Sequence, residues 1–354
     1  MKALNSLRKK IDETDRKIVD LLNTRARIIL EIGATKRKAG KGAYCPDRER
    51  DVLRKIAALN RGPLDKDALL SVYREIMSGS LALEKPLQIA YLGPEATFTH
   101  QAALKRFGTQ VSFVPCNGIS DVFLEVERGN CDYGVVPIEN SIEGAVNHTL
   151  DMFMDSDLRI CSQVMLPISH SLLSRCALKD IRRVYSKFEV FGQCRKWLQE
   201  NLPQTELIES SSTTKAAKIA AGEKGAGSIG SALAAKIYGL TIVAGSIEDS
   251  PHNITRFFVI GKAEVPPTGH DRTSLMFSIK DKVGALHEML VPFKKYGVNL
   301  NKIESRPSKR KAWDYYFFVD LEGHVGTPKV KKAIGELENK CKFLKVLGSY
   351  PVGE

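Results

Sequence analysis

Residues 4–32 read LNSLRKKIDETDRKIVDLLNTRARIILEI, and the spacing of their apolar side chains decides the fold of the first part of the chain. Steps of three and four residues return repeatedly to an apolar side chain. This pattern predicts one helix of about 35 residues, roughly 50 Å long at 1.5 Å per residue. The positions of this stripe are Leu4, Leu7, Ile11, Thr14, Ile18, Leu21, Arg25, Ile28 and Ile32.

Two shorter helices are predicted in the rest of residues 1–85. Pro46, with Asp47 and Glu49 close behind it, is typical of the first turn of a helix. Asp65 is a candidate N-cap for the other helix. Two short helices cannot cover so long an apolar stripe, so we expect an all-helical domain that forms an intertwined dimer.

Charged side chains lie on the apolar face of the long helix. Arg25 is a stripe position, and Lys36, eleven residues later, projects within about 20° of it at ~100° per residue. A single such side chain could extend along the apolar surface to solvent. Several together favour a small polyanion as their partner, because buried charge is costly without a group of opposite sign.

This block resembles the all-helical chorismate mutase family in the segments 7–12, 46–50 (PDRER) and 74–80 (REIMSGS). The resemblance implies a cofactor-free rearrangement of chorismate to prephenate, with Arg25, Lys36 and Glu84 as catalytic residues. Glu84 stands where some members have Gln, so it would donate a hydrogen bond to the substrate ether oxygen only when protonated. Cys45 replaces an acidic residue of many members. The implied substrate-binding residues are Arg8, which would reach the other subunit's pocket, Arg25, Lys36, Arg48, Glu49, Ser80 and Glu84.

Residues 86–265 alternate between strand and helix patterns, which predicts an α/β domain with mostly parallel sheets. The long extended stretch 158–174 suits two lobes flanking a cleft, as in periplasmic binding proteins. The predicted strands are 87–92, 111–115, 133–138, 158–174, 205–209, 227–230, 240–244 and 254–261. The predicted helices begin near Thr97 and cover 119–128, 142–153, 190–200, 213–221 and 231–238.

Three motifs of this block resemble prephenate dehydratase: 93–101 (GPEATFTHQ), 136–144 (VPIENSIEG) and 253–257 (NITRF). The resemblance implies loss of CO2 and the ring hydroxyl from prephenate, with Thr255 central to catalysis and Arg256 helping to hold carboxylates. Ala96 stands where most members have Gly, and 187–189 (KFE) replaces a His-Pro-Gln-like run. The implied cleft residues are Thr97, Glu139, Asn140, Ser141, Gln193, Ser212, Thr213, Thr255 and Arg256.

Hydroxyl side chains also crowd the predicted strand-to-helix turns of this block. N-capping accounts for most of them. The glycine-rich segment 225–230 lacks the G-x-G-x-x-G spacing of a dinucleotide site, so no NAD is expected.

Residues 272–354 follow the order strand, helix, strand, strand, helix, strand, which is the ferredoxin-like α+β arrangement. The expected strands are 274–280, 298–305, 314–321 and 343–349, and the helices 284–296 and 328–340. The motifs 284–287 (GALH) and 304–307 (ESRP) resemble those of the ACT regulatory domain, which implies a phenylalanine site. Its residues would be Gly284, Ala285, Leu286, His287, Glu304, Ser305, Arg306 and Pro307.

Composition limits the remaining possibilities. The chain has 354 residues and a net charge of +12, with the basic excess in the helical and last blocks. No apolar run has the length of a membrane span or a signal peptide, which favours the cytoplasm. Seven cysteines without C-x-x-C pairs indicate neither a disulfide framework nor a metal site.

Two further classes of protein were weighed against the enzyme. An amino-acid-sensing transcriptional regulator would join a basic DNA-binding head to a two-lobed effector domain, but its helix-turn-helix needs short helices around a tight turn. A solute-binding protein for uptake would need an export signal. We therefore expect a phenylalanine-inhibited bifunctional enzyme, a homodimer or larger assembly that binds neither nucleic acid nor membranes.

Overall fold

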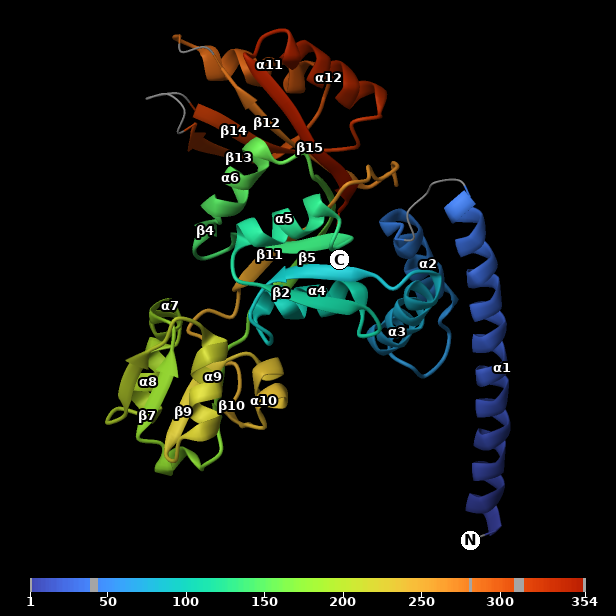
Figure 1. Cartoon of the computed structure of the whole chain (residues 1–354), viewed down its shortest axis with the longest axis vertical. Helices are drawn as coiled ribbons and strands as arrows, with labels where there is room; N and C mark the ends of the chain where they lie inside the picture. Colours follow the sequence, from blue (N-terminus) through green and yellow to red (C-terminus); the bar gives the residue numbers. More distant parts are fainter. Residues whose placement is uncertain (1, 39–43, 280–281, 309–314, 353–354) are drawn as a thin grey trace. The chain divides into compact units, whose positions relative to one another are not determined.

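The structure is a computed structural model that describes residues 2–38, 44–279, 282–308 and 315–352 (Figure 1). Its contacts divide the chain into two units. The first unit comprises residues 1–88 with 107–112, and the second comprises 89–106 with 113–354.

The first unit holds three helices, α1 (Lys2–Lys38), α2 (Pro46–Leu59) and α3 (Lys66–Glu84). Pro46 begins α2 and the Asp65 carboxylate caps α3 by accepting backbone N–H bonds, so both predicted helix starts are confirmed. The described core of this unit is small and centres on side chains of α2 and α3. Every α1 residue from Ala3 to Thr24 is exposed, including the apolar stripe.

The second unit contains two α/β lobes and a third sheet. The sheet of the first lobe has the order β2-β1-β3-β11-β5, with β4 added beside β3. Its strands are β1 (Gln88–Leu92), β2 (Ser112–Cys116), β3 (Tyr133–Asn140), β4 (Gly144–Ala145), β5 (Arg159–Pro167) and β11 (Ile254–Gly261). The helices between these strands are α4 (Phe98–Phe107), α5 (Ile119–Arg128) and α6 (Asn147–Asp155).

The sheet of the second lobe has the order β10-β6-β9-β7-β8. Its strands are β6 (Ser171–Ser174), β7 (Arg183–Ser186), β8 (Glu206–Glu209), β9 (Ala226–Gly230) and β10 (Thr241–Ala244). Its helices are α7 (Phe188–Gln193), α8 (Arg195–Asn201), α9 (Thr213–Gly222) and α10 (Ala232–Tyr238), with a 3-10 turn η1 (Leu178–Asp180). The predicted stretch 158–174 is thus two strands, β5 and β6, that belong to different sheets.

Both lobes have mixed sheets, which corrects the expectation of mostly parallel ones. The pairs β1–β3, β7–β8 and β7–β9 are parallel, but β11 runs antiparallel between β3 and β5. The chain crosses to the second lobe after β5 and returns to the first only with β11. This late return places β11 in the sheet without a helical crossover that would make it parallel to its neighbours.

Two predicted helices of the dehydratase block were too long. The helix expected at 142–153 begins only at Asn147, because Gly144 has a left-handed φ of 81° and pairs with Asn140 in the β3–β4 ladder. The helix expected at 190–200 is divided into α7 and α8 at Cys194, whose φ of −115° and ψ of 17° are not helical. The other predicted elements shift by a few residues.

The third sheet has the order β13-β14-β12-β15 and carries two helices, the ferredoxin-like arrangement expected from the sequence. Its elements are β12 (Asp271–Ser278), α11 (Ala285–Lys295), β13 (Leu300–Pro307), β14 (Tyr315–Glu322), α12 (Pro328–Glu338) and β15 (Phe343–Pro351). Residues 280 and 314, expected at strand ends, lie outside the described residues. We call this part the regulatory sheet because its motifs resemble those of the ACT regulatory domain.

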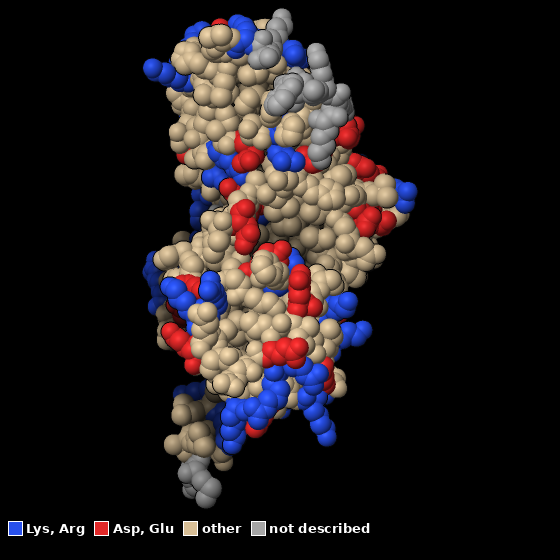
Figure 2. Space-filling view, turned by 90° about the vertical axis from the view of Figure 1, so that its left-hand side faces the viewer, with Lys and Arg blue, Asp and Glu red and all other residues tan. Residues whose placement is uncertain are grey.

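Side chains of both charge signs are interspersed over the face of the second unit drawn in Figure 2. Among the described helices, none is both long and apolar enough to cross a bilayer.

Candidate active sites and effector region

A cavity of about 190 Å3 lies among the three helices of the first unit. Six of the seven predicted mutase residues line it, as does Cys45, whereas Arg8 is exposed on α1 and does not. The charged and polar lining residues are Arg25, Lys36, Arg48, Glu49, Ser80 and Glu84, and the apolar ones include Ile29, Ile32, Val52, Met77 and Leu81.

The cavity holds its cations by contacts between α1 and α3. The Arg25 guanidinium donates to the Ser80 hydroxyl, and the Lys36 ammonium lies 3.2 Å from the Glu84 carboxylate. Burial lowers the pKa of Arg25, an effect that Tyr73 partly opposes. Burial likewise raises the pKa of the Cys45 thiol despite the nearby Lys36. Glu84 and Lys36 thus form an ion pair across this cavity.

The second candidate site surrounds Thr255, near the start of β11. Its hydroxyl oxygen accepts a 2.8 Å hydrogen bond from the Asn140 amide on β3, and the two residues are paired in register. The Asn140 carbonyl oxygen accepts the backbone N–H groups of Ile142 and Glu143, which fixes the orientation of the amide. Within the described part of the chain, no hydrogen bond uses the Thr255 proton, so this hydroxyl can donate to a bound molecule.

A chain of amides leads from Asn140 to the second lobe. The Asn140 amide also donates to the Asn253 carbonyl oxygen at 2.7 Å, and Asn253 donates to the Gln193 carbonyl oxygen at 3.2 Å. The Gln193 amide donates to the Glu143 carboxylate, so its oxygen must face the other way, toward Asn253 and His170. We call Asn140, His170, Gln193, Asn253 and Thr255 the Thr255 cluster.

His170 occupies the far end of this cluster and is 2% exposed. Its Nε2 lies 2.9 Å from the Gln193 carbonyl oxygen, which accepts only, so Nε2 carries the proton. Burial lowers the His170 pKa against the opposing effects of Gln193 and Glu248, and the ring is therefore neutral. His170 carries no local signal in the sequence and was not predicted, and no role was predicted for Asn253. The two-residue spacing from Asn253 to Thr255 predicts a shared strand face.

Four of the remaining predicted cleft residues lie at helix starts or bond to nearby backbone groups. The hydroxyls of Thr97 and Ser212 accept backbone N–H groups at helix starts, as N-capping predicts, and Thr213 begins α9. Ser141 donates to the carbonyl of His252 and accepts from the backbone of Ile254. None of these residues is hydrogen-bonded to the Thr255 cluster through a described side chain.

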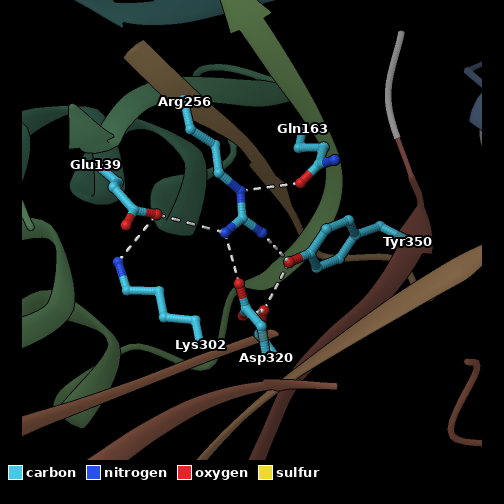
Figure 3. Close-up of polar contacts among 7 residues, drawn as sticks. Glu139, Gln163, Arg256, Lys302, Asp320 and Tyr350 are labelled. Atoms are coloured by element: carbon cyan, nitrogen blue, oxygen red, sulfur yellow. Dashed lines mark hydrogen bonds and ion pairs between the residues drawn. The ribbon is translucent and has the colours of Figure 1, made fainter. Parts of the chain in front are cut away.

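Glu139 and Arg256, by contrast, point toward the regulatory sheet. The Arg256 guanidinium donates to Asp320 at 2.5 Å and to the Tyr350 hydroxyl at 2.8 Å, and it is 5% exposed (Figure 3). Glu139 pairs with Lys302 at 3.0 Å. Successive strand residues face opposite ways, so the side chain of Arg256 points away from that of Thr255. The two residues were expected to line one cleft, and the structure does not bring them together.

Ala96, a departure from the dehydratase motif, adopts a left-handed φ of 70° and is buried. Its backbone N–H donates to His100 Nδ1, and its carbonyl accepts from Ser231 of the second lobe. The other departure, 187–189, begins α7 and contains an exposed ion pair between Lys187 and Glu189.

The two predicted effector motifs lie on different elements of the regulatory sheet. Gly284 precedes α11 with a left-handed φ of 76°, and Leu286 and His287 are exposed on the first turn while Ala285 is buried. The second motif, 304–307, ends the edge strand β13, where Ser305 and Pro307 are exposed and Glu304 is half-buried. Arg306 already binds Asp151 of α6 through both carboxylate oxygens.

No group of three or more His, Cys, Asp or Glu side chains in the described ranges could hold a metal ion.

Comparisons with known proteins match all three parts. Residues 7–85 match the family model for chorismate mutase type II, residues 89–265 that for prephenate dehydratase, and residues 273–339 that for the ACT domain.

Relatives match over nearly the whole length. The bifunctional chorismate mutase/prephenate dehydratase of Aquifex aeolicus is 51% identical over 99% of this chain and 98% of its own. The enzyme of the same name from Stutzerimonas stutzeri is 47% identical over 98% of this chain and 97% of its own. The crystal structure of a prephenate dehydratase from Arthrobacter aurescens in complex with L-Phe is 33% identical, covers 75% of this chain and 90% of that one, and has a TM-score of 0.70. This chain belongs to the bifunctional chorismate mutase/prephenate dehydratase family.

Proposed function

We propose that the chain catalyses two consecutive reactions, the rearrangement of chorismate to prephenate in the helical cavity and the conversion of prephenate to phenylpyruvate beside Thr255. The observation that carries the second assignment is the Thr255 hydroxyl, which accepts a bond from Asn140 and has its proton available to a substrate. The first assignment is supported by the cavity of the first unit, which is lined by the cationic side chains of Arg25, Lys36 and Arg48.

The mutase reaction is a pericyclic rearrangement that needs no nucleophile. Arg25 and Arg48 would bind the two substrate carboxylates, and Lys36 would hold negative charge that develops on the ether oxygen. Glu84, which lies beside Lys36, would donate to the same oxygen in its protonated form. Glu49 and Ser80 would complete the site together with Arg8 of the partner subunit.

The dehydratase reaction breaks two bonds of prephenate. The ring carboxylate leaves as CO2, and its bonding electrons enter the ring and expel the hydroxyl on the opposite carbon. Hydroxide is a poor leaving group, so Thr255 would relay a proton from solvent to that oxygen as the C–O bond breaks, and the oxygen would leave as water. Asn140 orients Thr255 and Gln193 orients the amide chain behind it. Thr97, Ser141, Ser212 and Thr213 remain proposed contacts for the substrate.

Phenylalanine would act on this chain as a feedback inhibitor. The support is the pair of motifs on α11 and β13, together with the bound L-Phe of the Arthrobacter aurescens prephenate dehydratase. We place the effector at Gly284, Leu286, His287, Glu304 and Ser305. Its affinity must differ between two states of the enzyme for binding to alter turnover.

The proposed assembly is a homodimer or larger. The exposed stripe of α1 is its support, since leucine and isoleucine side chains over 22 consecutive exposed positions need a cover. A cytoplasmic location and the absence of nucleic-acid and membrane partners remain predictions.

One assay tests these proposals together. Purified protein is supplied with chorismate, and chorismate loss and phenylpyruvate appearance are followed separately, with and without millimolar phenylalanine. Both reactions should occur, and phenylalanine should suppress phenylpyruvate formation. The variant Lys36→Met should lose the first reaction yet convert supplied prephenate at the wild-type rate. A folded wild type that turns over neither substrate would contradict the assignment, and a salt-dependent shift of DNA would then favour the regulator.

A further inference from the structure

Two neighbouring cross-strand pairs join β3 and β11, and their side chains face opposite ways. Thr255 is in register with Asn140, and Arg256 is in register with Glu139. The first pair is hydrogen-bonded within the Thr255 cluster. The second brings the Arg256 guanidinium to 3.8 Å from the Glu139 carboxylate on the opposite face. A single peptide unit on each strand therefore connects Thr255 and Asn140, the proposed catalytic pair, to Arg256 and Glu139, the charged pair.

The regulatory sheet holds both members of the charged pair (Figure 3). Asp320 on β14 and Tyr350 on β15 each bind a nitrogen of the Arg256 guanidinium, and Lys302 on β13 binds Glu139. Ser274 on β12 connects Asp320 with Tyr350, since its hydroxyl is 2.5 Å from the Asp320 carboxylate and 2.6 Å from the Tyr350 hydroxyl. All four strands of the sheet thus contribute to this second cluster, which surrounds Arg256 and is separate from the Thr255 cluster.

Burial makes these contacts decisive for the position of Arg256. Arg256 is 5% exposed, Asp320 6% and Tyr350 fully buried, and the third guanidinium nitrogen is taken by Gln163 on β5. Two cations and two anions balance within the cluster. Because an unpaired buried charge is strongly unfavourable, the guanidinium must remain where Asp320 lies. Without that carboxylate, the nearest anion would be Glu139, and Arg256 would be drawn toward β3.

The effector motif on β13 is connected to the same cluster. Lys302 lies two residues before Glu304, on the same face of the strand, and is the register partner of Asp320 on β14. A displacement of β13 caused by a ligand at 304–307 would therefore move Lys302 and Asp320 together. These two side chains contact Glu139 and Arg256, the two halves of the charged pair.

We propose that Asp320 and Tyr350 are positioning residues for the dehydratase reaction, which fix Thr255 and Asn140 through Arg256 and transmit the state of the effector site to them. This inference rests on the proposed function and identifies how its regulation reaches the catalytic pair. The structure assigns the regulatory sheet a part in turnover itself, before any effector binds.

The test compares full-length Tyr350→Phe and Asp320→Asn with a matched control on the same sheet. Tyr350→Phe removes one hydroxyl and keeps the ring, so it should fold even if Asp320→Asn does not. The control is Lys345→Met. The Lys345 ammonium on β15 donates to the carbonyls of Phe153 and Ser156, so it joins the sheet to the first lobe without contacting Arg256. Thermal unfolding by circular dichroism checks that each variant is folded.

In Tyr350→Phe, the dehydratase kcat should fall by about threefold or more with little change in KM, because catalytic groups are displaced while substrate contacts remain. The phenylalanine concentration for half-inhibition should rise by about fivefold or more. Asp320→Asn should show larger effects of the same sign. Chorismate loss in the mutase assay should be unchanged in every variant, and Lys345→Met should behave as wild type in both assays.

Two results would overturn the inference. One is a wild-type kcat and phenylalanine response in both cluster variants. The other is an equal loss in Lys345→Met, since any weakening of the joint would then suffice. A wild type that converts prephenate but ignores phenylalanine would remove the effector proposal, and the kcat comparison would still decide whether Asp320 and Tyr350 position Thr255.

Discussion

At the scale of single residues, the dehydratase site depends on which hydrogen each polar group offers. Asn140 gives its two amide hydrogens to Thr255 and Asn253, and backbone N–H groups fill its carbonyl oxygen. Exchanging the amide oxygen and nitrogen of Asn140 would break these hydrogen bonds, so the orientation of the amide is fixed. Thr255 thereby accepts a hydrogen bond from Asn140, which leaves its own hydrogen available to a bound molecule.

Thr255→Ala should abolish dehydratase turnover and leave mutase turnover unchanged, because it deletes the donor to the leaving hydroxyl. Thr255→Ser keeps that donor and should retain most of the rate. Both are measured with supplied prephenate and, in the same preparation, with chorismate. Loss of both activities in Thr255→Ala would show misfolding or a wrong division of the chain, and an active Thr255→Ala would exclude the donor role.

His170 predicts a pH-dependent stability. Its pKa is lowered in the folded protein, so the unfolded chain binds the proton more readily and the free energy of unfolding decreases as pH falls below about 6.5. Glu248, a nearby charged group, accepts the His170 backbone N–H and opposes the lowering of the pKa. His170→Gln keeps a donor near Nε2 without titrating, so its melting temperature should fall less than that of the wild type between pH 7.5 and 5.5.

The matched variant for His170 is His170→Leu, which removes the donor to Gln193. Its dehydratase kcat should be well below that of His170→Gln at pH 7.5. Equal melting curves for wild type and His170→Gln across this pH range would contradict the assignment of the titration to this ring.

At the scale of elements, the regulatory sheet meets the first lobe through an unusually close backbone contact. A Cβ at Gly348 of β15 would lie 2.3 Å from the carbonyl oxygen of Ile160 and 2.8 Å from its nitrogen. Ordinary Cβ contacts are longer, and neither group is a side chain that could move aside. Glycine at this position therefore permits β15 to pack on β5.

Gly348→Ala should force these strands apart and destabilise the chain by about 1–3 kcal/mol, the usual range for overpacking. The control is Gly335→Ala in α12, where the added methyl meets nothing within 4 Å. That change should stabilise by about 0.5–1 kcal/mol, because alanine favours a helix interior over glycine. Thermal melts of the full-length variants provide the comparison, and a neutral Gly348→Ala would refute the close contact.

At the scale of the whole molecule, the part of α1 from Ala3 to Thr24 is left exposed by the described residues of the first unit. The α1 stripe is exposed at Leu7, Ile11, Ile18 and Leu21, where 48% to 69% of each residue is accessible. At ~25 cal/mol per Å2 of apolar surface, covering this stripe would provide a substantial driving force for association. A second copy of the same helix is the partner that the proposed intertwined dimer supplies.

Ile18→Asp should dissociate the assembly and abolish mutase turnover while dehydratase turnover persists. Arg16→Asp, placed about 160° away from Ile18 around the same helix at ~100° per residue, is the matched control and should do neither. Light scattering coupled to size exclusion gives the mass, and both activities are assayed on the separated species. An unchanged mass and mutase rate in Ile18→Asp would mean that the stripe is not the interface.

The sequence by itself determined most of the local structure and the composition of the mutase cavity. Helix caps such as Asp65 and the three-four spacing of α1 act over a few residues, and they were predicted because near neighbours in the chain control them. Strand alternation also contained the opposite orientation of Thr255 and Arg256, although the resemblance to known motifs favoured placing both in one cleft.

Only the tertiary structure decided which distant groups these side chains meet. Arg256 binds partners 64 and 94 positions away, and His170 is linked to Thr255 through Gln193, Asn253 and Asn140. Such contacts depend on strand register and on the packing of β15 against β5, which no local pattern encodes. The physical reason is that periodicity and capping fix the direction of a side chain relative to its own backbone, while its partner depends on how separate sheets pack together.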